Sequence, residues 1–295
     1  MSVRIGINPL TWTNDDLPEL GDNNSLETCL TEAKLAGYEG VELGRKFPRE
    51  AKVLGPILEE HGLSLVSGWY SARLLERSVK DEIKAMQPHT TLLRKLGATA
   101  MVFCEVSRCV HGDRKVPLSQ RPQLAEKEWQ GFCRDLNAVS DYLRTQELKL
   151  AYHHHMGTVI QSEEEVDRMM DGTKAVGLLL DTGHLTFAGG DPMRTLTRHA
   201  KRLVHVHCKD IRKDRLEQAR QKDWSFLDSV VGDVFAVPGD GSIDFEPILK
   251  NLANAAYAGW LVVEGDQDPA RAHPLTHARI GHNCLRPLAQ RYWKT

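Results

Sequence analysis

The chain has 295 residues, with 38 Lys and Arg against 40 Asp and Glu and a formal net charge of −2. This length can bury a large core, and the near-neutral charge gives no support for a nucleic-acid-binding surface. No apolar run approaches the roughly 18 residues that span a bilayer. There is no signal-peptide core at the start, and the six scattered cysteines lack CxxC spacing, so we expect a reduced, cytoplasmic protein.

Short β-rich segments recur along the chain, with helical patterns between them. The eight segments are Arg4–Asn8, Gly37–Leu43, Leu63–Tyr70, Gly97–Glu105, Leu148–His153, Val176–Asp181, Leu203–His207 and Gly259–Glu264. Several are continuously apolar, which is typical of parallel strands buried on both faces. The count and the length predict one (β/α)8 TIM-barrel domain over residues 1–295, with an open α/β sheet as the alternative.

Capping signals fix several helix ends. A helix over 26–36 follows the first strand, and Gly62 suits the position just after the second helix. Asp191-Pro192 predicts the start of the helix after the sixth strand, and Asp244 is expected to cap a helix over 245–256.

Polar residues close most of the predicted strands. In chain order they are Glu42, Trp69 and Tyr70, Glu105, His153 to His155, Asp181, His207 and Glu264. Buried strands gain nothing from such endings, because uncompensated burial of polar groups costs several kcal/mol. Active sites of TIM barrels lie at the carboxyl ends of the strands. The pattern therefore predicts a shared ligand at this end.

The fifth strand ends in three consecutive histidines. Side chains alternate along a strand, so His153 and His155 share one face while His154 points away and is expected to be structural. Taken alone, the three histidines could form either a surface cluster or a binding site.

The sixth and seventh strands add further candidates. Asp181 at a strand tip is followed by His184, and we favour a site over an N-cap because the next helix is expected only at Asp191. His205, His207 and Lys209 share an inward face, which predicts a ligand at His207 and a hydrogen-bonded support at His205. The intervening Cys208 is expected to pack outward as a buried thiol.

His153, Asp181, His207 and Glu264 together offer two nitrogen and two oxygen donors. Such a set suits a borderline divalent ion such as Mn²⁺, Co²⁺, Zn²⁺ or Fe²⁺ better than Ca²⁺. Both carboxylates ionised would balance the charge of the ion.

At these residues the chain resembles the xylose isomerase-like TIM-barrel superfamily over its whole length. Within it, three stretches resemble the inosose dehydratase family: Gly6 to Trp12, Tyr152 to Thr158, and Leu180 to His184 with the following Gly-Gly-Asp-Pro. The resemblance implies dehydration of 2-keto-myo-inositol to 3D-(3,5/4)-trihydroxycyclohexane-1,2-dione in myo-inositol catabolism. It also implies a divalent ion, with Mn²⁺ or Co²⁺ favoured and Zn²⁺, Fe²⁺ or Mg²⁺ as alternatives.

The resemblance carries the metal positions onto His153, Asp181, His207 and Glu264. Many relatives have Glu where His153 stands, so His155 coordinating the ion instead stays open. The family's substrate contacts fall on further residues, namely Glu42, Trp69, Tyr70, His184 and Lys209.

The chemistry of elimination suggests a role for each of these groups. His155 is the expected base for the α proton, with His184 as the alternative. Lys209 would stabilise the oxyanion or protonate the leaving hydroxyl, unless it forms a plain salt bridge to Asp210 or Glu42. Glu42 would orient ring hydroxyls. Trp69 or Tyr70 would cover the ring, or simply pack.

Other functions stay open. A ketose epimerase or isomerase of the same superfamily would need a second carboxylate, for which Glu105 is the spare candidate. A non-catalytic binding barrel is the third hypothesis. Nuclease activity is disfavoured by charge and by the lack of extra histidines. The insertion over 211–237 is either a lid or a solvated charged segment, and the partners expected are a small cyclitol ketone and, for a homo-oligomer, a second copy.

Overall fold

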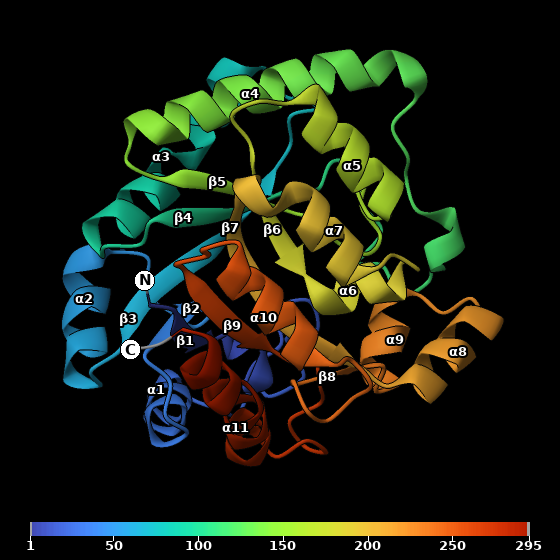
Figure 1. Ribbon diagram of the computed structural model, residues 1–295. Helices are drawn as coiled ribbons and strands as arrows, with labels where there is room; N and C mark the ends of the chain where they lie inside the picture. The colour runs from blue at the N-terminus through green and yellow to red at the C-terminus, as the bar shows by residue number, and fades with distance from the viewer. Residues whose placement is uncertain (1, 294–295) are drawn as a thin grey trace.

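In the computed structural model, which describes residues 2–293, eight parallel strands close into a barrel (Figure 1). The ring runs β1-β2-β3-β4-β5-β6-β7-β9 and back to β1. The barrel strands are β1 (Arg4–Ile7), β2 (Gly40–Leu43), β3 (Ser64–Ala72), β4 (Ala100–Glu105), β5 (Lys149–His153), β6 (Gly177–Asp181), β7 (Leu203–Ile211) and β9 (Trp260–Glu264). The predicted TIM barrel is confirmed, and each predicted segment overlaps one of these strands, although β3 and β7 extend beyond their predicted ends at Tyr70 and His207.

Helices surround the barrel in Figure 1 and cover the outer face of the strands. They are α1 (Leu26–Leu35), α2 (Ala51–Glu60), α3 (Val79–Lys95), α4 (Trp129–Thr145), α5 (Glu163–Gly172), α6 (Thr182–Phe187), α7 (Pro192–His199), α8 (Lys213–Gln221), α9 (Phe226–Val231), α10 (Phe245–Asn254) and α11 (Pro274–Tyr292). Short 3-10 turns are η1 (Pro9–Thr11), η2 (Leu118–Gln120), η3 (Glu126–Glu128) and η4 (Ala200–Arg202).

The helix ends follow the capping signals. Asp191 and Asp244 cap α7 and α10 by accepting hydrogen bonds from backbone N–H groups. Gly62, with a φ of 61°, follows the end of α2 in the left-handed region that glycine adopts easily. Val206 and Cys208 of β7 are fully buried in the apolar layer between barrel and helices, as alternation predicted.

The α6 helix corrects one prediction. A helix begins directly after β6, about ten residues earlier than expected, and the Oδ1 atom of Asp181 caps it by accepting a hydrogen bond from the His184 N–H at 2.7 Å. The N-cap and site interpretations of Asp181 are therefore compatible, because its other oxygen stays free for the site.

Between β7 and α10, the insertion forms a small packed unit rather than a solvated segment. It contains α8, α9 and β8 (Phe235–Ala236), which pairs antiparallel with the end of β7 (Figure 1). Buried residues from it, including Leu216, Phe226 and Phe235, form an apolar cluster with Leu17, Met156 and Phe187. The insertion is thereby anchored against the carboxyl end of the barrel.

None of the helices within residues 2–293 is both long and apolar enough to cross a membrane.

Candidate metal centre and active site

A cavity of about 240 Å³ opens at the carboxyl ends of the strands. Its walls contain most of the residues singled out from the sequence: Glu42, Trp69, His153, His155, His207, Lys209 and Glu264. Residues separated by more than 200 positions therefore meet in one place, as parallel strands of a barrel require.

Four side chains converge closely enough to hold a metal ion. One donor atom from each of His153, Asp181, His207 and Glu264 lies within 4.8 Å of the others, and all four residues are buried. The Nδ1 atom of His207 is 2.9 Å from Glu264 Oε2 and 3.5 Å from Asp181 Oδ2. The Nε2 atom of His153 is 3.6 Å from Asp181 Oδ2.

Three of these donor atoms have no hydrogen-bond partner. Asp181 Oδ2, His207 Nδ1 and Glu264 Oε2 are fully buried and unsatisfied although they face one another. A buried polar atom without a partner costs about 1–3 kcal/mol, so three aimed at one point need an explanation. A divalent cation between them satisfies all three, and the mixed nitrogen and oxygen donors fit such an ion.

The electrostatics of the cluster agree with this fit. Burial would lower the pKa of His207, but Glu264 and Glu42 raise it well above its usual value. The same field that stabilises a proton on this imidazole stabilises a metal cation beside it.

Hydrogen bonds select which nitrogen each histidine offers. The Nε2 atom of His207 lies 3.2 Å from Glu42 Oε1, so Nε2 carries the proton and Nδ1 faces the cluster. The Nδ1 atom of His153 donates to the carbonyl of His154 at 2.8 Å, leaving Nε2 for the cluster. Partners of this kind orient metal-binding imidazoles and fix their tautomer.

Glu42 lies beneath the cluster of metal donors, and its carboxylate is not free to bind the substrate ring. Its carboxylate accepts hydrogen bonds from Asn8 Nδ2 at 2.7 Å, Ser67 Oγ at 2.5 Å and His205 Nε2 at 2.9 Å, besides His207. Burial would raise the pKa of Glu42, yet His207 and His205 hold it well below its usual range. The geometry thus gives Glu42 the task of orienting His207.

His155 lies in the same cavity but outside the donor set. Its Nδ1 donates to the carbonyl of Met156 at 2.8 Å, so the Nε2 lone pair remains available. The ring packs on Trp69, on Phe226 and, with centroids 4.0 Å apart, on His184. Between the two imidazoles considered for the metal, the structure favours His153.

Lys209 is an ion-paired cation with only 1 % of its surface exposed. Its Nζ atom donates to Asp266 Oδ2 at 2.7 Å and to His184 Nε2 at 2.9 Å, and lies 3.2 Å from Glu264 Oε2. The alternative considered for Lys209, a salt bridge to Asp210 or Glu42, is not what the structure shows, because the lysine pairs with Asp266 instead. Since its Nε2 already accepts this bond, His184 is poorly placed as a base.

The two aromatic residues of β3, Trp69 and Tyr70, point to opposite sides of the strand. Trp69 lines the cavity and packs edge-on against His153 and His155. Tyr70 points to the opposite side, where its hydroxyl donates to Glu82 Oε1 at 2.5 Å and its ring packs on Phe103. Successive residues of a strand face opposite ways, so the assignment of Tyr70 to the substrate was wrong.

Glu105 also faces away from the cavity. Its carboxylate accepts hydrogen bonds from the backbone N–H groups of Leu74 at 2.6 Å and Ser107 at 2.7 Å. It holds two loops together and is not a spare carboxylate beside the donor set. His154 is likewise structural in its contacts, because its Nε2 accepts a hydrogen bond from Asp181 N at 3.3 Å.

Several residues of the cavity wall were missed from the sequence. They are Asn8, Asp15, Asp16, His111 and Asp266. Asp266 follows Glu264 by two positions, so continuing the strand alternation by one step would have found it. Asp16 and His111 lie in irregular loops, where no periodicity indicates a facing direction.

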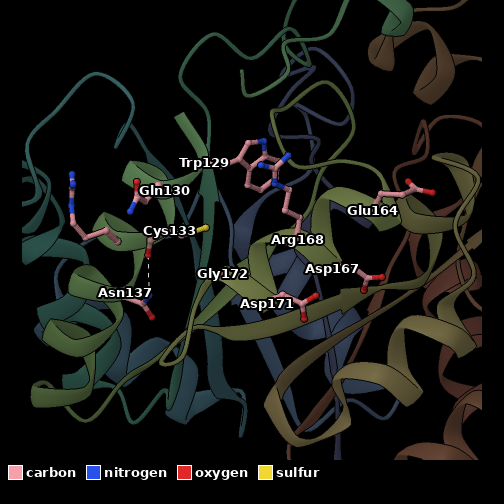
Figure 2. A pocket seen from close by; sticks show the side chains of 10 residues that line it. Trp129, Gln130, Cys133, Asn137, Glu164, Asp167, Arg168, Asp171 and Gly172 are labelled. Atoms are coloured by element: carbon pink, nitrogen blue, oxygen red, sulfur yellow. Dashed lines mark hydrogen bonds between the residues drawn. The ribbon is translucent and has the colours of Figure 1, made fainter. Parts of the chain in front are cut away.

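Cavity size alone would have indicated another place. A hollow of about 790 Å³ lies between α4 and α5, lined by Trp129, Cys133, Asn137 and Arg168 among others (Figure 2). The Arg168 guanidinium covers the Trp129 ring there, 4.5 Å from its centroid. It contains neither histidine nor a buried carboxylate cluster, so it does not compete with the strand-end cavity as a catalytic site.

Comparison with known proteins agrees with the fold. The family model described as "xylose isomerase-like TIM barrel" matches residues 30–288. The chain belongs to this family. Among solved structures of similar fold, one described as the IOLI protein with a binding zinc atom superposes with a TM-score of 0.71 at 16 % identity, covering 99 % of this chain and all of that one. An L-ribulose 3-epimerase gives 0.68 at 14 % identity over 99 % and 96 % of the two chains. Both show the shared fold.

Several curated proteins are more similar to this chain in sequence. The "Rhizopine catabolism protein MocC" of Rhizobium meliloti is 51 % identical over 98 % of this chain and 89 % of its own length. An inosose dehydratase of Clostridium tetani is 43 % identical over 94 % of both chains. Another, from Geobacillus thermodenitrificans, is 43 % identical over 96 % of both.

Proposed function

We propose that the chain is an inosose dehydratase, a metal-dependent hydro-lyase. Its substrate would be 2-keto-myo-inositol and its product 3D-(3,5/4)-trihydroxycyclohexane-1,2-dione, within myo-inositol catabolism. The observation that carries this proposal is the convergence of three unpartnered donor atoms at the strand ends, beside a cavity that also holds the free imidazole nitrogen of His155. We propose this substrate because the chain is 43 % identical to a protein named inosose dehydratase.

The residues present suit a divalent ion, for which we propose Mn²⁺ or Co²⁺, with Zn²⁺, Fe²⁺ and Mg²⁺ as alternatives. Its ligands would be His153 through Nε2, His207 through Nδ1, Asp181 and Glu264. When bound, such an ion supplies Lewis-acid stabilisation of negative charge on a substrate oxygen.

The protein's own groups divide the remaining work. His155, through its unprotonated Nε2, accepts the α proton of the ketone. Lys209 contributes a fixed positive charge near the developing oxyanion, while Asp266 and His184 hold it in place. Trp69 lines the cavity beside both histidines and would cover the ring of the substrate.

An assay of the product tests the proposal directly. The protein is incubated with 2-keto-myo-inositol and Mn²⁺, and formation of the diketone is followed. Failure to form diketone in protein with confirmed metal content would sink the dehydratase assignment. Epimerase activity, the alternative within the family, would instead return an isomeric ketone, and the position of Glu105 away from the cavity disfavours it.

A role in rhizopine catabolism is a second candidate, favoured by the 51 % identity to MocC. Offering rhizopine in the same assay separates the two. Consumption of rhizopine without turnover of 2-keto-myo-inositol would favour this candidate.

A further inference from the structure

Asp16 lines the cavity but belongs neither to the metal donor set nor to the contacts that hold Lys209. It lies in the loop after η1, and its side chain is 28 % exposed where it lines the cavity. Its Oδ1 is 3.7 Å from Nε2 of His111, whose ring centroid is 5.1 Å from that of His155. The carboxyl group is thus at the same cavity as the expected base, with one imidazole between them.

The other acidic groups of the cavity are already engaged. Asp266 pairs with Lys209 at 2.7 Å, and Glu42 with His205 at 2.9 Å. Asp181 and Glu264 belong to the metal donor set. Asp15 accepts a hydrogen bond from the backbone N–H of Arg45 at 3.3 Å.

Asp16 differs because its basic neighbour is uncharged. Burial lowers the pKa of His111 to about 4, so this imidazole is neutral near pH 7. Burial, together with the negative charges of Asp266, Asp15 and Glu264, raises the pKa of Asp16 to about 7 against the opposing effect of Lys209. A carboxyl group in this setting holds its proton near neutral pH and can also release it.

Lys209, the donor expected from the sequence, is less suited to give up a proton. Its Nζ atom is buried and held 2.7 Å from Asp266 Oδ2, in a salt bridge within the site. Its ammonium group already donates hydrogen bonds to Asp266 and His184, and it lies 3.2 Å from Glu264 Oε2. The lysine is a fixed charge.

We propose that Asp16 is the general acid of the elimination, the group that protonates the departing β-hydroxyl. This inference rests on the proposed dehydratase function. The α C–H bond breaks first, its proton passes to Nε2 of His155, and the electron pair is held as an enolate. The enolate then regains its C=O bond and forms the new C=C bond as the β C–O bond breaks. The carboxyl proton of Asp16 joins the departing oxygen, so water leaves. Solvent then reprotonates Asp16 and removes the proton from His155, and the enol tautomerises to the diketone.

The variant Asp16→Asn separates the two proton transfers. In D₂O, exchange of the substrate's α proton should continue within a few-fold of wild type, because His155 is intact. Formation of the diketone should fall by roughly 100-fold or more, since general acids contribute about 10²–10⁴-fold. The exposed Glu19→Gln, which removes a charge from the same loop, should change neither rate.

A fluorinated substrate supplies the second measurement. Fluoride leaves without prior protonation, so an analogue with fluorine at the β position should be eliminated by Asp16→Asn nearly as fast as by wild type. Asp16→Ser, which leaves space at the site, should regain elimination of the natural substrate when formate is added. These variants are compared at equal metal content and thermal stability.

The outcomes distinguish the two levels of the proposal. Wild type that neither exchanges the α proton nor forms diketone would defeat the dehydratase function itself. Active wild type with an equally active Asp16→Asn, or a variant that loses exchange as severely as elimination, would overturn the assignment of Asp16 while leaving the function standing.

Discussion

Glu42 and His207 form a hydrogen bond between Oε1 and Nε2, 3.2 Å apart, at the base of the strand-end cavity. This bond turns Nδ1 of His207 toward Asp181 and Glu264. Glu42, from β2, thereby sets the nitrogen that a histidine of β7 offers to the metal.

Removing this orienting bond should weaken metal binding. Glu42→Gln keeps the shape of the side chain but loses the charge that holds His207 and His205. Loss of such a partner typically costs 10–100-fold in metal affinity, which titration with Mn²⁺ or Co²⁺ measures. Glu39→Gln, just before the start of β2, half-exposed and outside the cavity, is the control. An unchanged affinity in Glu42→Gln would contradict the orienting role.

Asp181→Asn should abolish metal binding with little change in folding. The amide oxygen of Asn can still cap α6 by accepting from the His184 N–H, while the charge facing His207 is lost. We expect metal content after dialysis to fall below a tenth of wild type, and turnover with it. Asp191→Asn, at the cap of α7, should keep both. A metal-free Asp181→Asn that remains fully active would refute metal dependence.

The insertion should protect the histidines of the site from solvent. Phe226 is 1 % exposed and packs on His155 at a centroid distance of 4.8 Å. Phe226→Ala should cost about 3 kcal/mol of stability and speed hydrogen exchange over 213–236. Its turnover should fall more than that of Leu216→Ala, which opens space in the same apolar cluster away from the imidazoles. Equal turnover in both variants would make the insertion a purely structural unit.

The ion pair between Arg194 and Glu163, near the surface, should make the stability of the protein depend on pH. Arg194 lowers the pKa of Glu163, whose carboxylate also accepts from the Asp191 N–H at 2.9 Å. The folded protein thus binds this proton less readily than the unfolded chain. The stabilisation is complete above the unfolded pKa of about 4.3 and disappears as pH falls through the lower folded value.

The size of this effect follows from its setting. Arg194 has 65 % of its side chain exposed, so the pair should contribute about 1 kcal/mol at neutral pH. Glu163→Gln should therefore lower the free energy of unfolding by that amount at pH 7 and by much less at pH 3. Denaturant melts at both values measure it, and a loss that grows toward pH 3 would have the wrong sign.

The sequence predicted the barrel and the donor set for a definite physical reason. Parallel strands buried on both faces are continuously apolar, so Asp181, His207 and Glu264 stand out where each strand ends. The alternation of side chains along a strand also separated His153 from His154. It could not be applied to His155, because the strand ends at His153.

What the sequence did not predict lies where periodicity stops. Asp16 and His111 reach the cavity from loops, and the start of α6 directly after Asp181 left no gap that a pattern could mark. The packing of Phe226 onto His155 depends on a tertiary contact between the insertion and the barrel. The single domain over residues 1–295, a homo-oligomer and a cytoplasmic location stay predictions.

The central claim is that the His153, Asp181, His207 and Glu264 cluster holds one divalent ion on which dehydration depends. The most direct measurement is diketone formation from 2-keto-myo-inositol by chelator-treated protein titrated with Mn²⁺ or Co²⁺. We predict no activity without metal and a rise that saturates at one ion per chain. Full activity in metal-free protein, or none in protein that has bound one ion, would contradict the account.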